Sequence, residues 1–159
     1  MPVTTRIEEV RNEIAALAQA APSAKDVMQG VCRLLHERML KYNWVGFYML
    51  EPGAEPPVLV LEAFVGAMTP HTRIPLNQGI CGAAASSGKT IVVDDVSKDP
   101  RYLACSLETR SEIVVPIFVK NQVAGELDID SHFPAAFGAE DQALVQYCAE
   151  VVGKKLEKL

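Results

Sequence analysis

Long apolar runs are absent from the sequence, and so is an excess of positive charge. No stretch reaches the ~20 apolar residues of a transmembrane helix, and the N-terminal MPVTTRIEEV has no apolar signal-peptide core. The 159 residues carry 20 acidic against 15 basic side chains, a formal net charge of −5. Because nucleic acids and anionic membranes attract clustered positive charge, we expect neither as a partner. We expect a soluble, cytoplasmic protein.

Cysteine pairing motifs are also missing, because Cys32, Cys81, Cys105 and Cys148 form no CxxC pair and no closely spaced framework. A cytosolic protein of this size keeps such thiols reduced. Cys32 and Cys148 fall on the apolar stripes of two helical segments, which predicts small buried core residues. Cys81 lies near the start of a helix, where the helix dipole would favour its thiolate. Cys105 lies in a polar loop and is the stronger candidate for a reactive thiol.

What the sequence does contain is clear hydrophobic periodicity, with 49% hydrophobic residues. Helical spacing predicts two helices within residues 1–42 and a terminal helix through 144–156, and strands are expected at 44–50, 58–64, 91–93, 113–119 and 123–130. Residues 73–87 predict a glycine-punctuated turn that leads into a short helix. We expect one domain over 1–159, with helices in 1–42 and the sheet, active-site loops and terminal helix in 43–159. This order predicts an α+β fold around a central antiparallel sheet.

Acidic residues alternate with apolar ones in the segment VAGELDID, where Glu126, Asp128 and Asp130 would share one face of a strand. The strands expected at 113–119 and 123–130 flank a three-residue connection and so predict a hairpin, which brings Glu112 roughly opposite Asp130. A solvated sheet face is one explanation of this pattern. Aspartate is unfavourable in strands, however, and clustered carboxyls suit a cationic substrate group and raise the pKa of one member. We therefore favour a functional interpretation.

Two aromatic residues, Trp44 and Tyr48, lie an even number of positions apart and so share a strand face. Core packing explains both residues. A pocket wall for a methyl or thioether group is the alternative.

Several segments resemble the free methionine-(R)-sulfoxide reductases, which are built on the GAF fold. They are NWVGFY, RIPLNQGICGAA, LACS and SEIVVPIFVKNQVAGELDID, and the resemblance runs from about Asn43 to the C-terminus with order and spacing kept. It implies a GAF fold with N- and C-terminal helices flanking the sheet. It also implies an oxidoreductase that reduces free L-methionine-(R)-S-oxide to methionine through a cysteine sulfenic acid and a disulfide.

The resemblance assigns roles to particular residues of this chain. It implies that Cys105 is the catalytic nucleophile and that Cys81 is a nearby cysteine that assists the thiol chemistry. The residues that match the substrate-holding acids and the aromatic pocket for the methyl end are Glu112, Asp128, Asp130, Trp44 and Tyr48. Glu112 and Asp130 are the candidates for the acid that protonates the sulfoxide oxygen.

One departure from the family pattern concerns the cysteine two residues before the RIP motif, which forms the disulfide with the nucleophile. This chain has His71 there. Three alternatives stay open: Cys81 resolves the oxidised Cys105, an external thiol does so, or the activity has been lost. An imidazolium at His71 would assist by favouring a thiolate at Cys105. A partly exposed loop residue is the simpler explanation.

The implied chemistry needs no bound cofactor and no metal, since electrons come from NADPH through thioredoxin. The expected partners are therefore free methionine sulfoxide and thioredoxin, and a homodimer through the terminal helices is left open. The main alternative is a non-catalytic GAF module that binds a small ligand or senses redox state. A metal site from His71, Cys81 and Cys105 is a weaker alternative, because their spacing is irregular.

Overall fold

The computed structural model describes residues 3–103 and 107–158. Its helices and strands follow the order α1 (Val3–Ala20), α2 (Ala24–Arg38), β1 (Trp44–Leu50), β2 (Val58–Val65), β3 (Arg73–Pro75), α3 (Gly79–Ser87), β4 (Ile91–Val93), the short 3-10 helix η1 (Val96–Lys98), β5 (Ser111–Val119), β6 (Gln122–Ser131) and α4 (Ala139–Glu157). The strands form a six-stranded sheet in the order β3-β2-β1-β6-β5-β4. All neighbouring strands pair antiparallel. The predicted α+β class and central antiparallel sheet are therefore confirmed.

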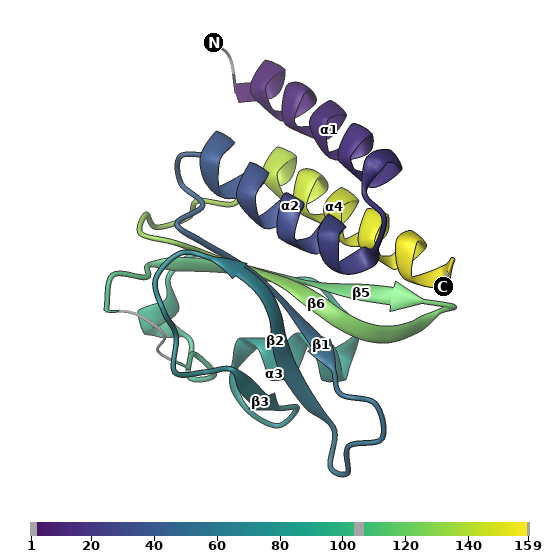
Figure 1. Ribbon diagram of the computed structural model, residues 1–159. Coiled ribbons are helices and arrows are strands. Elements are labelled where there is room, and N and C mark those ends of the chain that lie inside the picture. The colour runs from purple at the N-terminus through teal and green to yellow at the C-terminus, as the bar shows by residue number, and fades with distance from the viewer. Residues whose placement is uncertain (1–2, 104–106, 159) are drawn as a thin grey trace.

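The two faces of this sheet are covered differently (Figure 1). Helices α2 and α4 lie against one face, and α1 packs on those two helices. The short helix α3 lies on the other side of the sheet, where it contacts β5, β6 and the edge strand β3. Two separate clusters of buried side chains result, and the smaller one lies between α3 and the sheet. The candidate site belongs to this smaller cluster.

Helix α2 shows how the local sequence produces the larger layer. Ser23 is its N-cap, and the serine Oγ accepts a hydrogen bond of 3.2 Å from the backbone N–H of Asp26. Val27, Val31 and Leu35 recur at helical spacing and are fully buried. Burying side chains of this size stabilises the fold by roughly 1.5–3 kcal/mol each.

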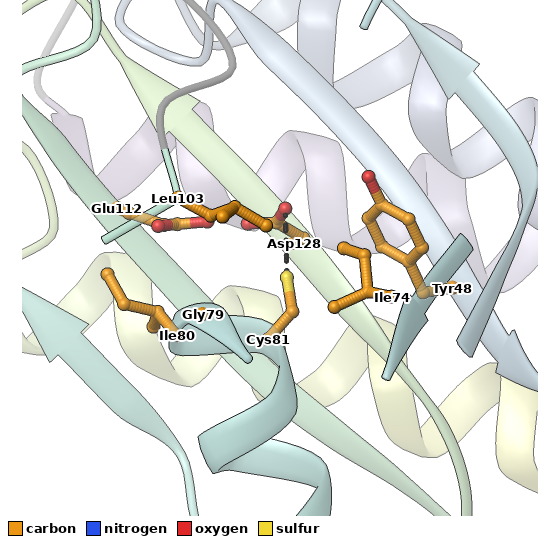
Figure 2. Close-up of a pocket in the computed structure, with 8 residues that line it drawn as sticks. All are labelled: Tyr48, Ile74, Gly79, Ile80, Cys81, Leu103, Glu112 and Asp128. Atoms are coloured by element: carbon orange, nitrogen blue, oxygen red, sulfur yellow. Dashed lines mark hydrogen bonds between the residues drawn. The ribbon is translucent and has the colours of Figure 1, made fainter. Parts of the chain in front are cut away.

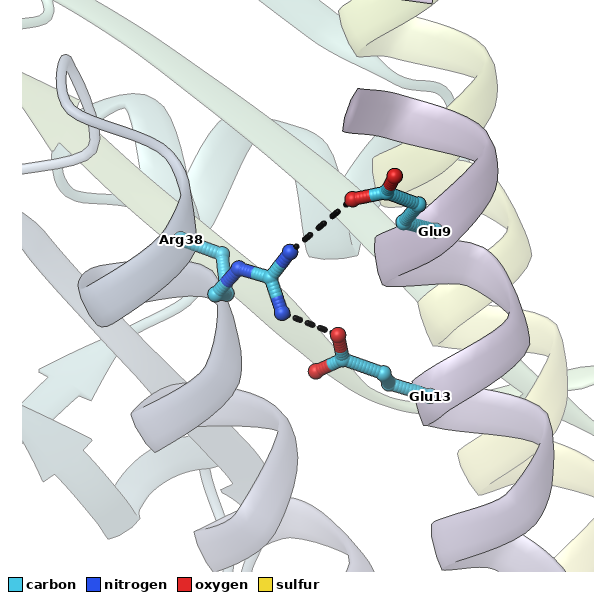
Figure 3. Close-up of polar contacts among 3 residues, drawn as sticks. All are labelled: Glu9, Glu13 and Arg38. Carbon is cyan, nitrogen blue, oxygen red and sulfur yellow. Dashed lines mark hydrogen bonds and ion pairs between the residues drawn. The ribbon is translucent and has the colours of Figure 1, made fainter. Parts of the chain in front are cut away.

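An ion-pair bridge joins the first two helices (Figure 3). Arg38, at the end of α2, donates one hydrogen bond to Glu13 and another of 3.2 Å to Glu9, both on α1. The three side chains are each more than a third exposed. Solvent screening therefore limits what the bridge contributes to stability.

The predicted strands at 44–50 and 91–93 have the same bounds in the structure as β1 and β4. Strand β3 was missed, because residues 73–75 were expected to form a turn. Three residues carry little periodicity, and this strand is defined by its partner: Ile74 pairs with Leu59 of β2. None of the helices in the described part of the chain has the length and apolar composition needed to cross a membrane.

Candidate active site

Four carboxyl groups on β5 and β6 are buried together on the face of the sheet that α3 covers. The hairpin pairs Glu112 with Asp130, as the sequence predicted. The exposed fractions are 5% for Glu112, 0% for Glu126, 2% for Asp128 and 3% for Asp130. A solvated sheet face is therefore the wrong explanation for this acidic alternation. Acids are almost never buried in this number without a partner or a function.

Helix α3 brings Cys81 to these acids. The chain enters the helix through Gly79, whose φ of 71° is in the left-handed region that favours glycine. Gly82 allows a close approach, since a Cβ there would lie 2.8 Å from the Leu76 carbonyl oxygen. Cys81 is buried at 6% exposure, and its Sγ donates a hydrogen bond of 3.3 Å to Asp128 Oδ2 (Figure 2).

The predicted activation of Cys81 by the helix dipole is wrong. The residue does lie in the first turn of α3, as expected. Burial nevertheless raises the pKa of the Cys81 thiol well above its ordinary value, and the negative charges of Asp128, Glu126 and Glu112 raise it further. A helix terminus favours a thiolate by an amount that falls off within a turn, whereas burial among acids opposes the charge directly. Cys81 is therefore a neutral thiol in the reduced protein.

The acids themselves favour their neutral forms. Burial is the main cause that raises the pKa of Glu112, Asp130 and Glu126 well above the ordinary values, and the charge of Asp128 adds to it in each case. Burial also raises the pKa of Asp128, although hydrogen bonding to Glu112 and Cys81 opposes that shift. The predicted raised pKa within the cluster is thus supported at several positions. A carboxyl that is neutral near pH 7 can donate a proton.

Two small cavities adjoin the cluster. A cavity of about 10 Å³ is lined by Tyr48, Ile74, Gly79, Ile80, Cys81, Leu103, Glu112 and Asp128 (Figure 2). A second cavity of about 170 Å³ is lined by Asn43, Trp44, Ala67, Met68, Thr69, Glu108, Thr109, Asp130 and His132. The first has room for about one water molecule. The acids therefore contact both a narrow inner space and a wider outer one.

Trp44 and Tyr48 lie on the same face of β1, as expected, with ring centroids 6.2 Å apart. Both rings are buried, as core packing predicts, and each also lines one of the two cavities. That they receive a methyl or thioether group stays a prediction. The Tyr48 hydroxyl donates a hydrogen bond of 2.7 Å to the carbonyl oxygen of His71. This contact holds the segment before β3 beside the cavities.

His71 is half-buried in that segment, in agreement with the simpler of the two expectations. Its backbone N–H donates a hydrogen bond of 3.0 Å to Thr69 Oγ1. The expected nucleophile Cys105 lies outside the described residues, so its position relative to His71 and Cys81 stays a prediction. The same holds for the metal site weighed from those three residues.

The other two cysteines are core residues, as predicted. Cys32 and Cys148 are fully buried between the helices and the sheet. Burial raises the pKa of Cys32 to about 12 and raises that of Cys148 as well. The sequence placed Glu126 on the acidic face and gave it no role, yet it is the most deeply buried acid of the cluster. Glu126 lies two residues before Asp128, on the same strand face, and this spacing could have assigned it to the buried cluster.

Comparisons with known proteins agree on a single family. The model of the GAF domain family matches residues 23–156. The chain is 36% identical over 144 residues to the free methionine-R-sulfoxide reductase of Escherichia coli (strain K12), covering 90% of this chain and 84% of the relative. It is 42% identical to a type II free methionine-R-sulfoxide reductase from Thermoplasma acidophilum, with a TM-score of 0.79 and coverage of 85% of this chain and 93% of that one. The enzyme from Neisseria meningitidis, solved in complex with its substrate, is 34% identical with a TM-score of 0.88, covering 95% of this chain and 88% of that one.

Proposed function

Because the chain belongs to the GAF domain family and, within it, to the free methionine-R-sulfoxide reductases, we propose that it reduces free L-methionine-(R)-S-oxide to methionine. The fold and the family expected from the sequence are thereby confirmed. The solved relatives from Neisseria meningitidis and Staphylococcus aureus include complexes with substrate. The acid cluster beside Cys81 is the observation in this chain that supports the proposal most directly.

Reduction of a sulfoxide needs a proton donor, because the leaving oxygen must not depart as a bare oxide. Glu112 and Asp130 are buried carboxyls, and burial raises the pKa of each well above its ordinary value, which favours the protonated form. Glu112 lines the inner cavity and Asp130 lines the outer one. A sulfoxide oxygen held between them would meet a donor on either side.

The proposed first step is attack of the Cys105 thiolate on the sulfoxide sulfur. The protonated oxygen then moves from the substrate sulfur to the Cys105 sulfur as the sulfur–sulfur bond made by the attack and the substrate sulfur–oxygen bond both break. Methionine leaves and Cys105 becomes a sulfenic acid. The sulfoxide sulfur is reduced by two electrons, and the cysteine sulfur is oxidised by two.

The second step regenerates the thiol. The Cys81 thiol attacks the sulfenic sulfur, a disulfide forms between Cys81 and Cys105, and water leaves. Thioredoxin then reduces the disulfide, and NADPH supplies its electrons. Because Cys81 is buried, a protein reductant would attack the sulfur of Cys105 and release Cys81 as the leaving thiol. No bound cofactor takes part in these steps.

The acids also explain a preference for the free amino acid. A free substrate carries an ammonium group, which a carboxylate in a water-poor site binds strongly. Asp128 is the candidate for this carboxylate: burial raises its pKa, but hydrogen bonds from Glu112 and Cys81 favour its charged form. A methionine sulfoxide within a peptide lacks this ammonium and should be a poor substrate.

The test follows NADPH consumption with thioredoxin and thioredoxin reductase. Free methionine-(R)-sulfoxide, the (S) epimer and a sulfoxide-containing peptide are supplied separately. We expect turnover of the free (R) epimer alone, and loss of turnover in Cys105→Ser. Asp130→Asn and Glu112→Gln should lower kcat by about 10²–10⁴-fold if each acts as a general acid.

The identity of the resolving thiol needs a second reductant. If Cys81 resolves Cys105, then Cys81→Ser should lose turnover with thioredoxin and keep it with dithiothreitol. Equal activity of this variant with both reductants would assign resolution to an external thiol. Saturable binding of methionine sulfoxide with no consumption of either reductant would contradict the proposed activity and favour a ligand-binding GAF module.

A further inference from the structure

Three potential metal ligands converge in the inner cavity. Cys81 Sγ, a carboxylate oxygen of Glu112 and a carboxylate oxygen of Asp128 all lie within 4.8 Å of one another, and all three residues are buried. They come from α3, β5 and β6, so the tertiary fold and not a local motif assembles them (Figure 2).

Further oxygens in this cluster are buried without a hydrogen-bond partner among the described residues. They are Glu126 Oε1 and Oε2, Asp128 Oδ1 and Asp130 Oδ1. A buried acceptor left without a partner destabilises the fold, because it has lost its hydrogen bonds to water. Four unpartnered oxygens beside a thiol form an environment that a cation would stabilise.

We propose that the reduced protein binds one zinc-class divalent cation here, through the thiolate of Cys81 and one oxygen each of Glu112 and Asp128. Ligand atoms on a tetrahedral Zn²⁺, with bonds of ~2.3 Å to sulfur and ~2.1 Å to oxygen, lie about 3.6 Å apart. The distance between Cys81 Sγ and Asp128 Oδ2 is 3.3 Å. The inner cavity of about 10 Å³ has room for one ion or one water molecule.

The donor set selects the class of ion. Mg²⁺ and Ca²⁺ prefer six or more oxygen ligands and several waters, which this narrow cavity does not hold. A thiolate is a soft ligand that favours Zn²⁺ and its relatives, and two carboxylate oxygens complete a mixed set that zinc accepts. Zn²⁺ binding displaces the Cys81 proton to solvent and changes no oxidation state.

The ion and the substrate exclude each other, a consequence that rests on the proposed function. Glu112 and Asp128 serve both as metal ligands and as substrate-holding acids. The ion also binds Cys81 Sγ, the sulfur that would otherwise attack the oxidised Cys105. Zn²⁺ is therefore a reversible inhibitor and takes no part in turnover. Formation of the disulfide removes the thiolate ligand and releases the ion.

The test titrates the reduced, metal-free full chain with Co²⁺, a spectroscopic substitute for Zn²⁺. A cobalt–thiolate bond produces a charge-transfer absorption band in the near ultraviolet. We expect this band to saturate at one Co²⁺ per chain. It should disappear in Cys81→Ala and persist in Cys148→Ala, which removes an equally buried thiol from the opposite face of the sheet. Asp128→Asn should weaken Co²⁺ binding by at least about 10-fold. Loss of a residue that only hydrogen-bonds to a metal ligand already lowers metal affinity by about that factor, and loss of a direct ligand should lower it further.

Three results would overturn the inference: no charge-transfer band up to millimolar Co²⁺, a band that survives in Cys81→Ala, or a band lost in Cys105→Ser. The thermal unfolding midpoint of each variant excludes simple misfolding. The two proposals fail independently. Turnover without a cobalt–thiolate band would contradict the metal site alone. A band without turnover would contradict the proposed enzymatic activity and support the metal site. Saturating methionine should shift the Co²⁺ midpoint upward if both ligands share the acids.

Discussion

Replacing Glu126 by glutamine should make the free energy of unfolding less dependent on pH. The side chain is fully buried, and both of its oxygens lack a hydrogen bond among the described residues. Burial raises its pKa well above the ordinary value of 4.5. Glutamine has nearly the shape of the protonated acid and does not ionise, so the substitution removes the titration and leaves the packing.

The direction of the effect follows from proton binding. Above pH 4.5, the unfolded chain releases the Glu126 proton while the folded chain keeps it. Stability contributed by this group is complete below that pH and is lost as the pH rises toward the folded-state pKa. Within that window, the loss is about 1.4 kcal/mol for each pH unit. Glu126→Gln should therefore gain stability relative to the native sequence by about that amount per pH unit.

The assay is urea unfolding at pH 5, 6 and 7 in the presence of a reductant. Glu62→Gln is the matched control, since it makes the same substitution at an exposed glutamate on β2. The other buried acids titrate in both proteins, so the difference between the two profiles isolates Glu126. Parallel profiles for Glu126→Gln and the native sequence would refute the reasoning, because they would mean that Glu126 titrates alike in both states.

Three further predictions concern stability. Gly153→Ala should destabilise α4 by about 1–3 kcal/mol in urea unfolding, because its Cβ would lie 2.5 Å from the Phe118 carbonyl oxygen; stabilisation would mean that helix propensity, worth about 1 kcal/mol, outweighs the contact. Arg38→Met should lower the free energy of unfolding by about 0.2–1 kcal/mol per lost ion pair, and a loss that persists in high salt would contradict an electrostatic origin. Tyr48→Phe should cost about 1 kcal/mol through the lost hydrogen bond to His71, and an unchanged thermal midpoint would show that the bond is neutral.

The sequence predicted the helices, the strands and their register better than it predicted how deeply the side chains are buried. Apolar runs located β1 and β4, and the hairpin spacing placed Glu112 opposite Asp130. Alternation assigns side chains to a common face, but it carries no information about what covers that face. Here α3 covers it, through contacts with β5 and β6 that lie far from α3 in the sequence. The burial of the acids was therefore beyond the reach of strand periodicity.

The error at Cys81 has the same physical origin. A position in the first turn of a helix is readable from a glycine-rich entry, and the dipole argument uses only that position. The acids that raise the thiol pKa come from β5 and β6, many residues away in the chain. Local sequence therefore predicts that the helix lowers the pKa of Cys81. The tertiary fold raises that pKa by more, through burial and the neighbouring acids.

A neutral thiol at Cys81 is compatible with the proposed cycle when protons are counted. The acid that protonates the sulfoxide oxygen in the first step is left as a carboxylate. In the second step the Cys81 thiol must lose its proton, and its Sγ already donates a hydrogen bond to Asp128 Oδ2. Asp128 in turn adjoins Glu112, with which its ionisation is linked. In the proposed cycle, the cluster can thus recover in the second step the proton that it gave up in the first. The carboxylate left by the first step would then accept the proton of Cys81, which the intact cluster keeps neutral at rest.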